Sequence, residues 1–245
     1  MRTRSPSANE LIISYLTLRK AIGWIGVLLP IVLIVGQVIF FSRVIPWSVS
    51  DYYYTHMRNI FVGSLCAIGV FLLSYEGYDD WDERITGLAG LGAIGTAFSP
   101  TTPPAALVLT TGQQVVGDLH IAFAALTFTT LAVMAFRFTK TYPEATPACP
   151  GLLWRILDIL GLTGTPGGAG IPADKRTRNR IYRICGISIV ASLTLAVLSL
   201  LLPHSIQNAA PFVYIFESTA IIAFGLSWFV KGEGLSRFLP SESTR

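Results

Sequence analysis

The side chains that could do chemistry lie in, or close to, the polar connections between long apolar runs. Carboxylates and histidines there could bind a metal ion or exchange protons, and cationic or amide groups could hold the headgroup of an amphiphile. These candidate site residues are Asp51, His56, Arg58, Asn59, His120 and Glu217. Four of them come from one segment, residues 46–59, which reads PWSVSDYYYTHMRN. A connection that only joined two apolar runs would not need this density of polar and aromatic groups.

Glu217 places the strongest constraint on its surroundings. It lies about six residues into the apolar run PFVYIFESTAIIAFGLSWFV, roughly 9 Å below the edge of the membrane at ~1.5 Å per residue. Exposing a carboxylate to lipid at that depth costs on the order of 3 kcal/mol. Glu217 is therefore expected to face the interior of a helix bundle and to be protonated or paired, with Arg58 and His120 as the expected partners.

Two interpretations of these residues involve no chemical reaction. In a structural network, Glu217 pairs with Arg58 or His120 and Asp51 caps the helix that follows, which fixes helix register. In a binding site, Arg58, Asn59 and His120 hold the headgroup of a lipid or other amphiphile while the apolar runs hold its acyl chains. We take the binding or organising of an amphiphile near the outer leaflet as the expected function.

The third interpretation is a metal-dependent membrane hydrolase that acts on a lipid ester or amide. His56, His120 and Glu217 are the candidate ligands, and zinc is the candidate metal because it activates water when held by three such groups. The sequence contains no HExxH motif and no two histidines four residues apart. Zinc is therefore kept as an alternative, and the binding function is preferred over an enzyme.

The elements that position these residues follow from composition. The chain is 52% hydrophobic and 13% charged, whereas soluble domains carry about 25% charged residues, so a soluble domain is excluded. A membrane-spanning helix needs roughly 20 apolar residues. The sequence predicts one all-α membrane domain over residues 1–245 with six spans. These cover about residues 21–41, 59–75, 85–98, 119–136, 184–202 and 212–230.

The basic residues predict how this domain is oriented. Of the 18 Lys and Arg residues, all except Arg43 and Arg58 fall on one side of the predicted spans. The positive-inside rule then places both termini in the cytoplasm and the candidate site on the outer face. We expect the protein to lie in the plasma membrane. The net charge of +4 does not indicate nucleic-acid binding, since the basic residues flank apolar runs.

The cytoplasmic loop over residues 137–183 has features of its own. Residues 151–161 read GLLWRILDILG, which is too short to span and predicts a helix lying in the inner interface. The cluster from Lys175 to Arg183 is rich in basic residues. Membrane lipids are thus the expected partners, with anionic lipid at this cluster.

The arrangement resembles the six-span superfamily that contains the damage-regulated autophagy modulators (DRAM) and the Golgi factors that remodel GPI-anchor lipids. The matching residues are the Ser50–Asp51 pair in the first outer loop, His120 at the start of the fourth span and Glu217 in the sixth. Ser218 departs from the tryptophan that usually follows this glutamate, and the basic loop is longer than in the family. The resemblance implies cytoplasmic termini and a role in lipid remodelling, lipid organisation or membrane trafficking.

A still greater similarity is to uncharacterised bacterial multi-pass membrane proteins with a YYxTxMR-type first loop. It is seen here in Tyr53, Tyr54, His56, Met57 and Arg58. This similarity implies a membrane location and no particular activity.

Overall fold

The computed structural model describes residues 8–77, 79–103, 108–140, 173–207 and 210–232. Within these ranges the chain is helical and contains no strand. The long helices are α1 (Ala8–Phe40), α2 (Arg58–Leu73), α3 (Asp80–Phe98), α4 (Thr111–Arg137), α6 (Ala173–Ser199) and α8 (Phe212–Lys231). The short elements are η1 (Ser50–Tyr54), η2 (Phe138–Lys140) and α7 (His204–Gln207).

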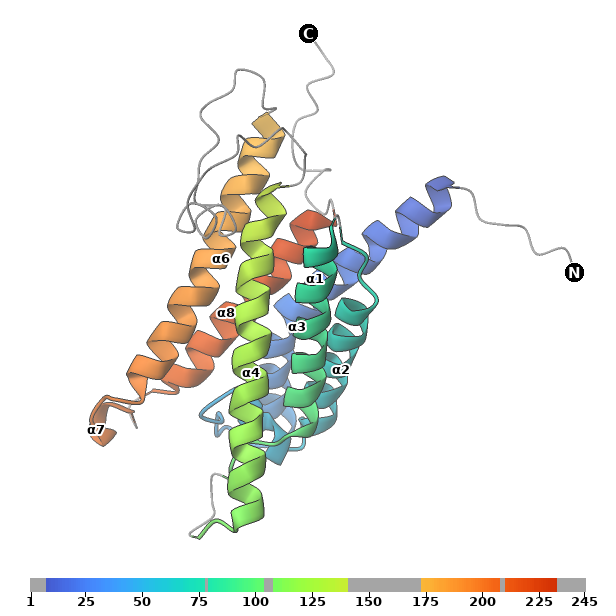
Figure 1. Ribbon diagram of the computed structural model, residues 1–245. Coiled ribbons are helices and arrows are strands. Elements are labelled where there is room, and N and C mark those ends of the chain that lie inside the picture. Colours follow the sequence, from blue (N-terminus) through green and yellow to red (C-terminus); the bar gives the residue numbers. More distant parts are fainter. Residues whose placement is uncertain (1–7, 78, 104–107, 141–172, 208–209, 233–245) are drawn as a thin grey trace, which may run out of the picture.

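The long helices form a closed ring in which neighbours along the chain are also neighbours in space (Figure 1). Helices α2, α3, α4 and α6 each pack on the helix before and the helix after, and α8 closes the ring by packing on both α6 and α1. Successive helices run in opposite directions (Figure 1). We call one end of the ring the Trp228 end, where α1 begins and α8 finishes, and the opposite end the Glu217 end.

Four helices are long and apolar enough to cross a membrane, as expected of a membrane protein. They are α4, α8, residues Leu16–Phe40 of α1 and residues Lys175–Ser199 of α6. Helix α2 is apolar but has only 16 residues. Helix α3 has 19 residues and opens with an acidic first turn. The all-helical architecture is as predicted, while length and composition alone identify four spanning helices instead of six.

Several helices begin before the apolar runs that predicted them. Helix α3 begins at Asp80 because the Asp79 side chain accepts the Asp82 N–H at 2.8 Å. Helix α4 begins at Thr111, where Thr110 and Gln113 form a reciprocal capping box. These starts are polar, so hydropathy does not reveal them. The predicted interfacial helix over residues 151–161 lies outside the described residues.

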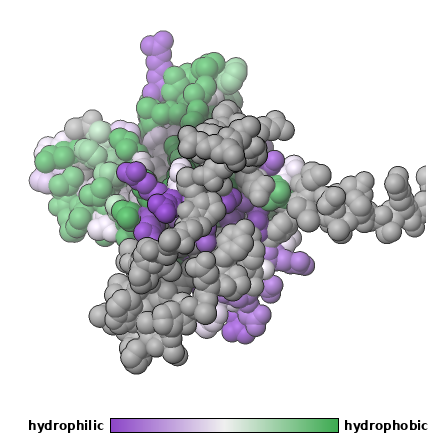
Figure 2. Space-filling view, turned by 90° about the horizontal axis from the view of Figure 1, so that it is seen from above, coloured by the Kyte–Doolittle hydropathy of each residue, from purple (hydrophilic) through white to green (hydrophobic). Residues whose placement is uncertain are grey.

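The Trp228 end is filled by aromatic rings. Trp228 is fully buried and meets Tyr75 and Phe138 edge to face, with ring centroids 4.9 and 5.3 Å apart. Phe224, one turn earlier in α8, also packs on Trp228. Seen from this end, hydrophilic side chains gather among the helix ends, and hydrophobic ones cover the side of the bundle (Figure 2).

Glycines allow α1 and α8 to pack closely. A Cβ atom added at Gly225 would lie 2.6 Å from the Val27 backbone nitrogen, and one at Gly26 would lie 2.9 Å from the Gly225 Cα. Side chains at these positions would force the helices apart, which explains why small residues occupy the contact. This contact fixes the position of α8, and therefore of Glu217, relative to α1.

Candidate functional site

The connection between α1 and α2 folds over the Glu217 end of the ring. Val49, Tyr52 and Met57 from this connection are buried in one apolar cluster with Leu29, Leu33 and Phe61 of α1 and α2 and Tyr214 of α8. Burial raises the pKa of the Tyr52 hydroxyl, so this group stays protonated at physiological pH. The segment over residues 46–57 is therefore an ordered cover for the bundle and not a loose loop.

Asp51 holds the fold of this cover. Its carboxylate accepts the Ser48 N–H at 3.1 Å, and its own N–H donates to Ser48 Oγ at 3.0 Å, which is the reciprocal pattern of a capping box. The Thr101 hydroxyl donates to the other carboxylate oxygen at 3.2 Å. Asp51 was predicted to cap the helix at residue 59. It stabilises η1 instead, and Met57 precedes α2 without a side-chain cap.

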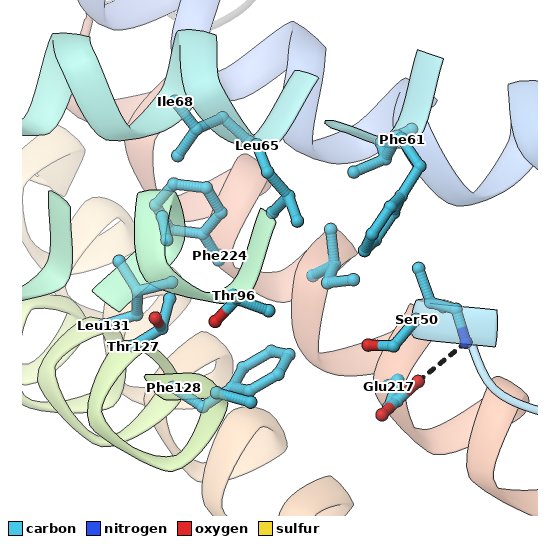
Figure 3. A pocket seen from close by; sticks show the side chains of 15 residues that line it. Ser50, Phe61, Leu65, Ile68, Thr96, Thr127, Phe128, Leu131, Glu217 and Phe224 are labelled. Atoms are coloured by element: carbon cyan, nitrogen blue, oxygen red, sulfur yellow. Dashed lines mark hydrogen bonds between the residues drawn. The ribbon is translucent and has the colours of Figure 1, made fainter. Parts of the chain in front are cut away.

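Glu217 joins α8 to the same cover. Its Oε2 atom accepts the backbone N–H of Val49 at 2.7 Å (Figure 3), and the Ser50 N–H lies beside the carboxylate. One turn earlier, the Tyr214 N–H donates to the Trp47 carbonyl at 2.9 Å, which satisfies an N–H group that a helix start leaves free. Glu217 faces the interior as predicted, but its partner is a backbone group.

The two cations predicted to pair with Glu217 have other partners. Arg58 is exposed and donates to the Tyr53 hydroxyl, with its guanidinium 3.9 Å from the Tyr53 ring centroid. His120 is buried, and its Nδ1 lies 2.5 Å from the Ser99 carbonyl at the end of α3. His120 thus satisfies a carbonyl that a helix end leaves free. The predicted pairing of Glu217 with Arg58 or His120 is wrong.

His56 and Asn59 are exposed at the outside of the ring. The His56 ring stacks on Phe41, with centroids 4.6 Å apart and planes 7° apart. Across the part of the chain that the structure describes, no three His, Cys, Asp or Glu residues come together as a metal site would require. The proposed zinc ligands His56, His120 and Glu217 occupy three separate environments.

A small cavity lies inside the ring beside Glu217. It has a volume of about 50 Å³, enough for a few water molecules at roughly 10–15 Å³ each. It is much smaller than the roughly 300–1,000 Å³ of a typical ligand pocket. Hydroxyl groups of Ser50, Thr96 and Thr127 interrupt an otherwise apolar lining (Figure 3). The cavity beside Glu217 therefore has the size of a water site and not of an acyl-chain pocket.

A larger groove lies on the outside of the ring, between α1 and the start of α2. We call it the α1–α2 groove, and its volume is about 450 Å³, within the range of ligand sites. Gly36 shapes it, because a Cβ atom there would lie 2.3 Å from the Met57 Cε. Its lining is apolar apart from one imidazole. The lining residues are Ile31, Val32, Val35, Gly36, Phe40, Phe41, His56, Met57 and Ile60.

Comparison with known proteins does not assign the chain to a family. No family model, curated protein or solved structure matches it. The function is therefore inferred from the positions of the side chains. Of the residues that sequence reasoning missed, Ser48 had a signal in its three-residue spacing from Asp51, whereas Val49 acts through its backbone and had none.

Proposed function

We propose that this protein crosses the membrane six times and binds one acyl chain of an outer-leaflet phospholipid in the α1–α2 groove. The observation that carries the proposal is the groove itself, about 450 Å³ in volume, apolar, and edged by His56. The groove is lined by α1, one of the helices apolar enough to cross a membrane. In that position the groove faces hydrocarbon, and a lipid tail fills it.

The charges at the groove edge favour a phosphate headgroup. Phe41 and His56 stack at this edge, and Arg43 follows Phe41 by two residues and is exposed. Two residues span at most about 7 Å of chain, so a guanidinium lies within reach of a headgroup whose tail is in the groove. Arginine binds phosphate through charge-assisted hydrogen bonds.

The proposed orientation has both termini in the cytoplasm and the groove on the outer side. In the described part of the chain, every Lys and Arg except Arg43 and Arg58 lies at the Trp228 end of the ring. The positive-inside rule therefore supports a cytoplasmic Trp228 end. Helices α2 and α3 complete the ring between α1 and α4, which supports counting them as spans.

The resemblance to the superfamily of DRAM and the GPI-lipid remodelling factors is likewise a proposal. It is supported by the Ser50 and Glu217 side chains, which line the same cavity although they are far apart in the sequence. A lipid-binding role agrees with what that resemblance implies. The hydrolase alternative has no such support, since its three proposed metal ligands do not meet.

Filling the groove tests the proposal. Val35→Trp places an indole in the groove, and Val190→Trp on α6 is the matched control because the two valines are 46% and 48% exposed. Native mass spectrometry of the protein released from phospholipid nanodiscs measures the retained lipid. We expect at least tenfold less bound phospholipid in Val35→Trp than in Val190→Trp. Equal retention in the two variants would refute the groove as the binding site.

A further inference from the structure

The cavity beside Glu217 contains more hydrogen-bond acceptors than donors. The Thr96 hydroxyl donates to the Gly92 carbonyl at 2.8 Å, and the Thr127 hydroxyl donates to the Phe123 carbonyl at 2.8 Å. Each threonine has therefore used its proton within its own helix and presents only an acceptor oxygen to the cavity. The Glu217 carboxylate adds further acceptor positions, and the Ser50 hydroxyl is the only other side-chain donor among the described lining residues.

The cavity also lacks a positive charge. Among its described lining residues, contributed by α1, η1, α2, α3, α4 and α8, Glu217 is the only titratable side chain. The charged side chain that acts on Glu217 is Asp51, which has the same sign as an ionised Glu217. Arg58 and His120 are engaged by Tyr53 and Ser99. A lone carboxylate anion in apolar surroundings is strongly unfavourable, whereas a neutral carboxylic acid is not.

We propose that Glu217 and this cavity form a proton-binding site. One carboxyl oxygen accepts the Val49 N–H, as the structure shows. The other carries the bound proton and donates a hydrogen bond to Ser50 Oγ or to a water molecule in the cavity. The bond that forms is O–H on Glu217, and the bond that breaks is O–H in a hydronium ion of the solvent, which is left as water, so there is no redox change.

The packing of the helix ring determines from which side this proton arrives. The cavity extends from Glu217 to Phe224, and beyond Phe224 the ring is filled by Trp228 with Tyr75 and Phe138. In the described residues these rings pack edge to face between the cavity and the Trp228 end. The proposed site therefore exchanges its proton through the cover at the Glu217 end.

Infrared spectroscopy of the purified protein tests this inference. A protonated carboxyl group gives a C=O stretching band that carboxylates and amides lack, and the band shifts in D₂O. We expect the wild type to show this band at neutral pH, Glu217→Gln to lose it, and Glu76→Gln, which changes an exposed glutamate at the other end of the ring, to retain it. Absence of the band from the wild type would overturn the proposal.

A second variant, Ser50→Ala, and a test for sodium binding complete the experiment. If Glu217→Gln does not purify, Ser50→Ala replaces it, and a shift of the band in that variant assigns the band to Glu217. A band that is unchanged in Ser50→Ala and also present in Glu217→Gln would refute the assignment. Sodium is the competing ligand, and stabilisation by sodium chloride relative to potassium chloride that disappears in Glu217→Gln would replace the proton with a sodium ion. The outcome of these measurements does not depend on lipid binding in the α1–α2 groove, so the two proposals can fail separately.

Discussion

The two ends of the helix ring hold their buried charges in opposite ways. At the Trp228 end, Arg137 bonds Asp82 at 2.5 Å and Asp79 at 2.7 Å, so cation and carboxylates neutralise one another. At the Glu217 end, Asp51 and Glu217 are held by backbone N–H groups and a hydroxyl, and no cation accompanies them in the described residues. One end is filled by aromatic rings, and the other contains a cavity.

This contrast separates the part of the molecule that fixes the fold from the part that is available for binding. At the Trp228 end, an ion pair and packed aromatic rings occupy the space between the helices. At the Glu217 end, a carboxylate held by a backbone N–H lies beside a cavity, which offers space for a ligand. The buried Arg19 guanidinium at the Trp228 end donates to the Tyr75 hydroxyl at 3.0 Å. Changes at the Trp228 end should therefore reduce stability, and changes at the Glu217 end should mainly alter binding.

The largest expected effect comes from opening the filled end. Trp228→Ala removes a fully buried indole from contact with Tyr75, Phe138 and Phe224. Large aromatic-to-alanine changes in a core cost about 3–5 kcal/mol. Unfolding in a mixed-micelle denaturation series measures the loss. Trp24→Ala is the control, because Trp24 is 52% exposed, and a similar loss in both variants would contradict the role given to Trp228.

Breaking the ion pair of the filled end should have the next largest effect. Arg137→Ala leaves Asp82 buried without its cation, which costs about 3 kcal/mol for a buried pair. Asp79→Ala should cost far less because the Asp79 side chain is 55% exposed. The same denaturation series separates these values. Equal losses in Arg137→Ala and in Arg84→Ala, which changes an exposed arginine of α3, would show that the pair contributes nothing specific.

A smaller effect is expected at the Glu217 end. Asp51→Ala removes the capping box with Ser48, which costs about 1 kcal/mol. In a double-mutant cycle, Ser48→Ala should add little once Asp51 is alanine, because the two residues form one unit. Asp118→Ala is the control on an exposed aspartate of α4. Strictly additive losses for Ser48 and Asp51 would show that the capping box is not a coupled unit.

The helices could be predicted from the sequence, and their ends only in part. Apolar runs identify membrane helices because lipid requires every backbone group to bond within the helix. The starts of α3 and α4 were missed because Asp79 and Thr110 act as polar caps outside those runs. The depth of each candidate residue in the membrane was predicted from the same runs and stays a prediction, while the structure places Glu217 beside a cavity inside the ring.

The pairings within the site could not be predicted. Hydropathy gives the depth of a residue but not the direction in which its side chain points, so Arg58 was assigned to Glu217 although it faces Tyr53. The actual partner, the Val49 N–H, is a backbone group that every residue except proline has. The α1–α2 groove was also missed, because its lining in α1 has the same composition as any lipid-facing surface.

The segment over residues 46–57 has one further consequence for the function. Val49 and Ser50 form one wall of the inner cavity, while His56 and Met57 form a wall of the α1–α2 groove. This one segment thus lies between the proposed proton site and the proposed lipid groove. If one ligand displaces this segment and so alters the affinity for the other, thermodynamic linkage requires the second ligand to alter the affinity for the first by the same factor. A proton at the proposed Glu217 site and a lipid in the proposed groove would then each change the affinity for the other.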